Sequence, residues 1–232
     1  MQYNDINSSR RGFLSKIATG AAALGAATLI NPLKAAAEAS GMSPKDYADA
    51  DAWFNQINGK HRVVFDATRP HEIMPFAWPK VFLLTNAATG TPEKENSAVV
   101  VLRHDAIPYA FPSSLWAKYK FGEVFKADDP KTGKPSVRNP FWQPGPDDFQ
   151  VPGLGSVPIG INQLQESGVL FCVCNMAIIV YSAAIAQGAG LNAEDVKKDM
   201  LANVLPGIQV VPSGVWALGR AQEHKCAYIF AG

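Results

Sequence analysis

The sequence predicts a single α/β domain with a flavodoxin-like, doubly wound sheet of five mainly parallel strands. Short apolar runs recur after residue 60, and segments typical of helices separate them. One run, residues 98–102, is apolar at every position, which indicates a strand buried on both faces. Strands that alternate with helices form βαβ crossovers, which place helices on both faces of a parallel sheet.

Each expected element has its own signal. Strands are expected at residues 63–65, 98–102, 169–174, 208–211 and 227–230. Helices are expected at residues 47–54, 73–86, 112–120, 159–167, 176–187, 193–205 and 213–223. Asn192 and Ser213 stand where N-caps are needed, and Gly188 and Gly207 follow helix ends.

Residues 122–157 interrupt this alternation. They are rich in proline and glycine, which excludes long helices and central strands. We expect a largely irregular insertion that forms a lid over the strand ends or an oligomer contact.

The chain opens with a pattern that closely matches a twin-arginine export signal. Arg10 and Arg11 are adjacent, and Phe13 and Leu14 follow them. The next apolar stretch, residues 17–30, is shorter than the roughly 20 residues that span a bilayer.

Small residues then form two A-x-A-like cleavage sites, which end at Ala37 and at Ala39. The sequence does not choose between them. We expect residues 1–39 to be a signal peptide and residues 40–232 to act in the periplasm or otherwise outside the cytoplasm. An uncleaved anchor or an ordinary helix is the alternative.

The charge balance gives no sign of a nucleic-acid partner. The whole chain has a net charge of +1, and removal of residues 1–39 would leave about −1. A nucleic-acid-binding domain normally carries a basic patch or stripe, so we expect none here. We also expect no membrane association after cleavage.

In a doubly wound sheet, ligands collect outside the carboxyl ends of the strands. The second expected strand is followed by Arg103 and His104, the third ends at Cys174, and the fourth is followed by Ser213. We therefore expect these residues to lie along one edge. No G-x-G-x-x-G, C-x-x-C or C-x-x-C-H motif is present, so the sequence gives no dinucleotide, thioredoxin-like or c-type haem signature.

Cys174 is the most informative residue, because a buried strand ends there and a helix begins. A helix N-terminus favours the thiolate, and His104 or Arg103 nearby would add to this effect. We expect the pKa of Cys174 to fall below its reference of about 8.5. The alternative is an inert cysteine packed like a small hydrophobe.

The other two cysteines are weaker candidates for the reactive thiol. Cys172 lies two residues before Cys174 on the same strand face, with an expected Cα separation of about 6.6 Å, at the upper limit for a disulfide. We expect Cys172 to belong to the core. Cys226 lies at the start of the last expected strand, at the sheet edge opposite the one where Cys174 and the other candidate site residues are expected. Three cysteines leave at least one free thiol.

Three segments together resemble the DsrE/DsrF-like sulfur-relay family. Residues 99–108 are similar to the family's second strand, which often ends in histidine. Residues 168–177 are similar to its third strand with the active cysteine, and residues 205–215 to its fourth strand and the following turn. The succession covers about 120 residues. The chain departs from the family in two ways: it carries an export signal, whereas classical members are cytoplasmic, and it has the extra insertion at 122–157.

The resemblance implies a trimer or hexamer and a cysteine, here Cys174, that carries a persulfide to a sulfur-carrier or redox partner. His104 and Arg103 complete the expected site, and no cofactor is expected. Non-covalent haem or metal binding through His104 with Cys174 is one alternative. A binding or assembly module without chemistry is the other.

Overall fold

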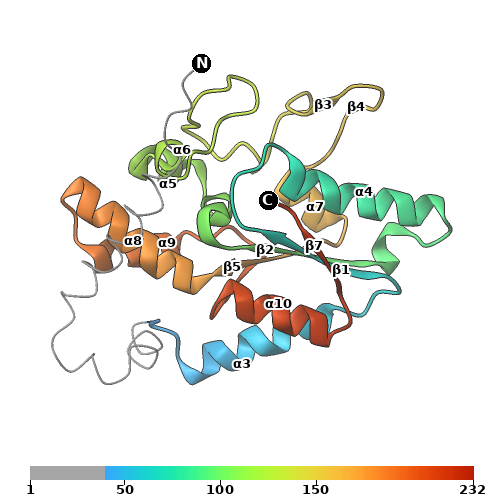
Figure 1. Cartoon of the computed structure of the whole chain (residues 1–232), viewed down its shortest axis with the longest axis horizontal. Coiled ribbons are helices and arrows are strands. Elements are labelled where there is room, and N and C mark those ends of the chain that lie inside the picture. Colours follow the sequence, from blue (N-terminus) through green and yellow to red (C-terminus); the bar gives the residue numbers. More distant parts are fainter. Residues whose placement is uncertain (1–39) are drawn as a thin grey trace, which may run out of the picture.

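A computed structural model of the chain describes residues 40–232 and shows a three-layer α/β fold (Figure 1). The expected signal peptide, residues 1–39, lies outside the described residues. The central sheet contains β1 (Arg62–Ala67), β2 (Ser97–Leu102), β5 (Leu170–Cys174), β6 (Ile208–Val211) and β7 (Ala227–Phe230). All neighbouring pairs in this sheet are parallel. The α/β class and the five-stranded parallel sheet are therefore confirmed.

The strand order is β6-β5-β2-β1-β7, which differs in one respect from a flavodoxin-like sheet. In that order the first strand lies between the second and the third. Here β1 lies between β2 and the last strand, β7. Backbone hydrogen bonds join the carboxyl ends of β1 and β7. The amide of Ala231 donates to the Asp66 carbonyl at 2.9 Å, and that of Thr68 donates to the Gly232 carbonyl at 2.7 Å.

Helices cover both faces of the sheet (Figure 1). α4 (Met74–Ala88) and α7 (Ile161–Glu166) lie on one face, and α3 (Pro44–Trp53) and α10 (Gly214–Glu223) lie on the other. α8 (Asn175–Ala189) and α9 (Ala193–Ala202) pack against each other beyond β5 and β6. Successive strand residues serve opposite cores: Phe65 packs with the α4 side, and Val64 with the α10 side.

Shorter elements complete the described part of the chain. They are η3 (Phe54–Gln56), η4 (Glu93–Glu95), η5 (His104–Ala110), α5 (Ser113–Tyr119), α6 (Phe121–Val124), β3 (Gln150–Val151) and β4 (Gly155–Ser156). The turn η5 directly after β2 was not expected from the sequence, and it changes the position of His104.

The insertion at residues 122–157 is largely irregular, as expected, but it is firmly packed. Phe141 is fully buried and stacks on Phe76 of α4 and on Phe149, with ring centroids 4.1 and 4.9 Å apart. The buried Asn139 side chain donates to the carbonyls of Tyr109 and Phe111, both at 2.9 Å. These contacts make the insertion part of the core on the α4 side.

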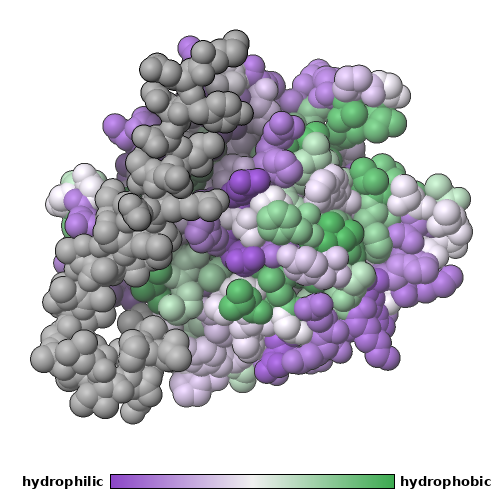
Figure 2. All heavy atoms as spheres, in the orientation of Figure 1, coloured by the Kyte–Doolittle hydropathy of each residue, from purple (hydrophilic) through white to green (hydrophobic). Residues whose placement is uncertain are grey.

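The surface seen in Figure 2 has a mostly polar rim over α3 and α10 and apolar side chains near its centre. Three consecutive exposed apolar side chains, Tyr228, Ile229 and Phe230, belong to β7, which is an edge strand. Among residues 40–232, no helix has the length and apolar character needed to cross a membrane.

Candidate functional site

The carboxyl ends of β2, β5 and β6 meet at one edge of the sheet. Leu102 is paired with Val173, and Cys174 with Val211. Arg103 therefore follows β2 beside Cys174, and α10 begins just after β6. The sheet brings together two of the three residues predicted for the site, Arg103 and Cys174, and adds the start of α10.

Cys174 is both the last residue of β5 and the N-cap of α8. Its sulfur accepts a hydrogen bond from the amide of Ala177 at 3.3 Å. The amide of Gly214, the first residue of α10, also acts on the sulfur and favours its thiolate. The Met176 amide donates to the Pro212 carbonyl at 3.3 Å and adds to the same effect. Two helix N-termini thus converge on one thiol, where their dipoles favour negative charge.

Burial opposes this effect. Only 6% of Cys174 is exposed, and burial raises the pKa of its thiol more than the amide donors and Arg103 lower it. The pKa therefore lies above its ordinary value, and the prediction of a lowered pKa was wrong. The reason is desolvation, which depends on the packing around the sulfur.

An ion pair between the half-buried Arg103 and the buried Asp66 holds Arg103 in place at this edge. Its Nε and Nη2 donate to the two carboxylate oxygens of Asp66, at 2.6 and 2.8 Å. The Tyr228 hydroxyl also donates to Asp66, at 2.8 Å, and only 1% of Asp66 is exposed. Asp66 and Tyr228 therefore fix the guanidinium in a bidentate pair.

The side chain of Arg103 also packs closely against Gly214. A Cβ added at Gly214 would lie 2.5 Å from the Cβ of Arg103, which is too close for any larger residue. The absence of a side chain at Gly214 is what lets the start of α10 approach both Arg103 and Cys174.

Sequence reasoning missed Asp66 and Tyr228. A signal for Asp66 was present, because a carboxylate that ends an apolar strand needs a buried partner. Tyr228 had no comparable signal, since only the placement of β7 beside β1 brings its hydroxyl to Asp66.

His104 lies in a neighbouring constellation. Its φ of 52° turns the chain out of the β2 direction and into η5. The ring faces Tyr181 of α8, and its Nδ1 lies 3.3 Å from a carboxylate oxygen of Asp105. The Tyr181 hydroxyl donates to the same carboxylate. The hydrogen bond with Asp105 raises the pKa of His104.

All three cysteines are free thiols, so the expected absence of a Cys172–Cys174 disulfide is confirmed. Cys172 is fully buried on the α10 side, as expected for a core residue, and burial raises its pKa strongly. Cys174 packs with the other core, because the chain turns into α8 at this residue, so the expectation that both cysteines share one strand face was wrong. Cys226 is also buried, and burial raises its pKa to about 11.

The described residues contain no group of three or more histidine, cysteine, aspartate or glutamate side chains placed to hold a metal ion. His104, one of the two ligands considered in the alternative above, is engaged with Asp105 and Tyr181. The polar groups around the Cys174 sulfur are instead backbone amides and one guanidinium, and all of them favour a thiolate there.

Comparisons of the chain with protein-family models, with curated proteins and with solved structures find no match.

Proposed function

We propose that the protein is an exported sulfur carrier that accepts and passes on a persulfide sulfur through Cys174. The observation that carries this proposal is the convergence of the α8 and α10 N-termini and Arg103 on one sulfur. The resemblance to DsrE/DsrF-like proteins supports the same function.

The transfer needs no external oxidant. The Cys174 sulfur attacks the outer sulfur of a donor persulfide, so that a new S–S bond forms and the donor's own S–S bond breaks. The donor leaves as a thiolate, which takes up the proton of the Cys174 thiol. An acceptor thiolate then removes the outer sulfur by the same exchange and releases Cys174.

The residues at the site have distinct parts in this exchange. The amides of Met176, Ala177 and Gly214 favour negative charge on the sulfur during attack and departure. Arg103 adds positive charge, and Asp66 with Tyr228 orients it. A role for His104 as a further electrostatic neighbour stays a prediction.

The burial of Cys174 suits a relay. A thiol with a raised pKa is mostly protonated near neutral pH and reacts slowly with free oxidants. Exchange would then depend on a docked donor or acceptor that reaches the sulfur.

The test is intact and peptide mass spectrometry after incubation with glutathione persulfide. We expect a gain of about 32 Da, one sulfur atom, located on Cys174. Cys174→Ala should abolish the gain, and Cys226→Ala, at a cysteine of equal exposure, should keep it. Sulfur found equally on Cys226, or on no cysteine, would contradict the proposal.

Export through the twin-arginine pathway is a separate part of the proposal, and its motif lies outside the described residues. Replacing Arg10 and Arg11 together by lysine should retain the precursor in the cytoplasm. Normal export of this variant, measured by cell fractionation, would refute the assignment.

We also propose that the chain forms a homo-oligomer. The exposed apolar side chains of β7, together with Val81 and Leu84 of α4, provide apolar surface for association. Light scattering coupled to size-exclusion chromatography should show a trimer or hexamer. A monomer at all concentrations would contradict the proposed homo-oligomer.

A further inference from the structure

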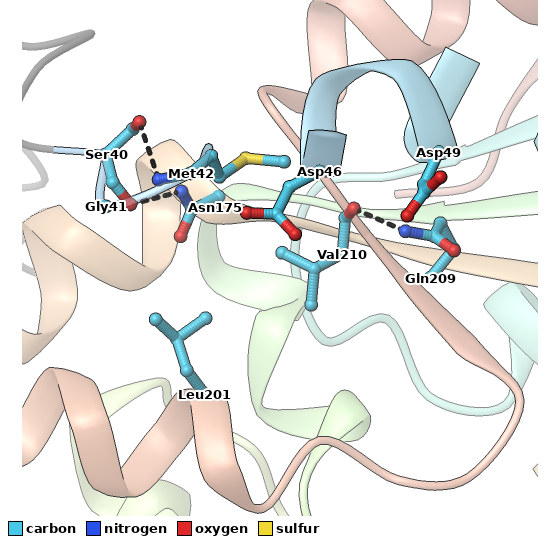
Figure 3. A pocket seen from close by; sticks show the side chains of 9 residues that line it. All are labelled: Ser40, Gly41, Met42, Asp46, Asp49, Asn175, Leu201, Gln209 and Val210. Carbon is cyan, nitrogen blue, oxygen red and sulfur yellow. Dashed lines mark hydrogen bonds between the residues drawn. The ribbon is translucent and has the colours of Figure 1, made fainter. Parts of the chain in front are cut away.

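A cavity lies outside β6, and Cys174 does not line it. It has a volume of about 280 Å³ and lies between the start of α3, the edge strand β6, the start of α8 and the end of α9 (Figure 3). Its lining residues are Ser40, Gly41, Met42, Asp46, Asp49, Asn175, Leu201, Gln209 and Val210. Cys174 is not among them.

Asn175 supplies a hydrogen-bond acceptor that no group in the described part of the chain satisfies. Its amide nitrogen donates to the Ser40 carbonyl at 2.9 Å, which determines the orientation of the side chain. The residue is 0% exposed, and its Oδ1 has no hydrogen-bond partner. Figure 3 shows this oxygen turned away from Ser40 toward the space above Leu201. A buried unpaired oxygen is costly, so the site favours a ligand that donates a hydrogen bond.

The remaining polar groups of the cavity are also mainly acceptors. Asp46 and Asp49 are carboxylates, and hydrogen bonds from Ser43 lower the pKa of Asp46, so that it is ionised at neutral pH. Gln209 uses its amide nitrogen on the Val210 carbonyl at 2.9 Å, which leaves its oxygen as an acceptor.

Among residues 40–232, no lysine or arginine belongs to the lining. The two nearby cations have their own carboxylate partners. Lys45 pairs with Asp49 at the exposed end, and Lys197, whose Nζ lies close to Gly41, pairs with Glu194 at 3.0 Å. One wall of the cavity is apolar and is formed by Met42, Leu201 and Val210.

We infer that this cavity binds a small organic cation that has a primary ammonium group and a short alkyl chain. The ammonium would donate to Asn175 Oδ1 and to the Asp46 carboxylate, and the alkyl chain would lie along Leu201 and Val210. An anion is disfavoured by the two carboxylates. A neutral molecule would satisfy Asn175 but would leave Asp46 without an ion-pair partner among the described residues, since Lys45 pairs with Asp49.

This inference does not depend on the sulfur-transfer proposal. Asn175 follows Cys174 directly in the chain, but the two side chains serve different sites, since the sulfur interacts with the amides of α8 and α10. The test below therefore uses a readout that does not involve the thiol.

The probe is n-butylammonium chloride, titrated into the purified full chain, with n-butanol as the neutral analogue of the same shape. We expect saturable binding in the millimolar range, as suits a ligand of this size, together with a shift of the Asn175 side-chain amide resonances in ¹⁵N–¹H spectra. Equal responses to n-butanol and n-butylammonium, or no shift of the Asn175 amide, would overturn the inference.

Variants separate the contribution of charge from that of shape. The double variant Asp46→Asn with Asp49→Asn keeps oxygen acceptors but removes both charges, so binding should weaken at least tenfold. Asp51→Asn is the matched control on α3, because Asp51 pairs with Arg220 and does not line the cavity. Binding unchanged in the double variant would refute the inference. If that variant fails to fold, Leu201→Phe, which fills the cavity, must abolish binding for the inference to stand.

Discussion

Cys174 and Cys226 are equally inaccessible, with 6% of each residue exposed, yet they lie at opposite ends of a parallel sheet. Cys174 ends β5, where two helices begin. Cys226 precedes β7, and its amide donates to the Ala221 carbonyl near the C-terminus of α10. Burial is the largest influence on both thiols, but amide donors act on the sulfur of Cys174, and for Cys226 only Arg62 opposes burial.

Equal burial therefore does not give equal chemistry. In a βαβ layout, helix N-termini gather at the carboxyl ends of the strands, and helix C-termini at the amino ends. The direction of the strand determines which kind of backbone group surrounds a cysteine. The following predictions test this contrast, from the largest expected effect to the smallest.

The strongest test removes the charge beside Cys174. Arg103→Met leaves Asp66 buried without its cation, which should lower the free energy of unfolding by about 3–5 kcal/mol. Chemical denaturation monitored by circular dichroism measures this change. The double variant Arg103→Met with Asp66→Asn should regain part of the loss. A loss below 1 kcal/mol in the single variant would show that Asp66 does not depend on Arg103.

The second test compares the two thiols directly. In the folded protein near neutral pH, iodoacetamide should modify Cys174 at least tenfold faster than Cys226, a difference of about 1.4 kcal/mol in the barrier. Peptide mass spectrometry at successive times gives both rates in one sample, and denatured protein is the control in which the rates should converge. Equal rates in the folded state would mean that the helix N-termini do not activate Cys174.

The pH dependence of alkylation follows from the raised pKa of Cys174. Because the thiolate is the reacting form and the pKa lies above its ordinary value, the rate should rise about tenfold per pH unit and should not level off below pH 8.5. A small exposed thiol, measured beside it, should level off earlier. A plateau for Cys174 near pH 7 would show that the amides and Arg103 outweigh burial.

The smallest expected effect concerns the start of α10. Ser213 accepts a hydrogen bond from the Trp216 amide, and Ser213→Ala should cost about 1 kcal/mol of stability. Fraying of this helix end would move the Gly214 amide away from the sulfur, so alkylation of Cys174 should slow two- to threefold. Asn192→Ala removes the N-cap of α9 and is the control, because α9 supplies no amide to Cys174. If alkylation of Cys174 slows equally in both variants, the cause is a general loss of stability and not the position of the Gly214 amide.

The strands could be predicted well, because each is a short apolar run between turn residues. The expected range 208–211 matches β6, and 227–230 matches β7. The turn η5 was missed, since His104 adopts a left-handed backbone that residues other than glycine seldom take and that the sequence does not mark. The sequence placed His104 with Arg103. In the structure the His104 side chain lies against Asp105 and Tyr181, and Arg103 still acts on its charge.

The sequence by itself determined the α/β class, the five strands and the position of Cys174 between a buried strand and a helix, because these follow from local apolar patterns. The tertiary structure decided the strand order, the Asp66–Arg103–Tyr228 network and the direction of the Cys174 pKa shift. These properties depend on which distant segments are neighbours and on how much water they exclude. The local order of apolar and polar residues does not specify which distant segments become neighbours or how much water they exclude.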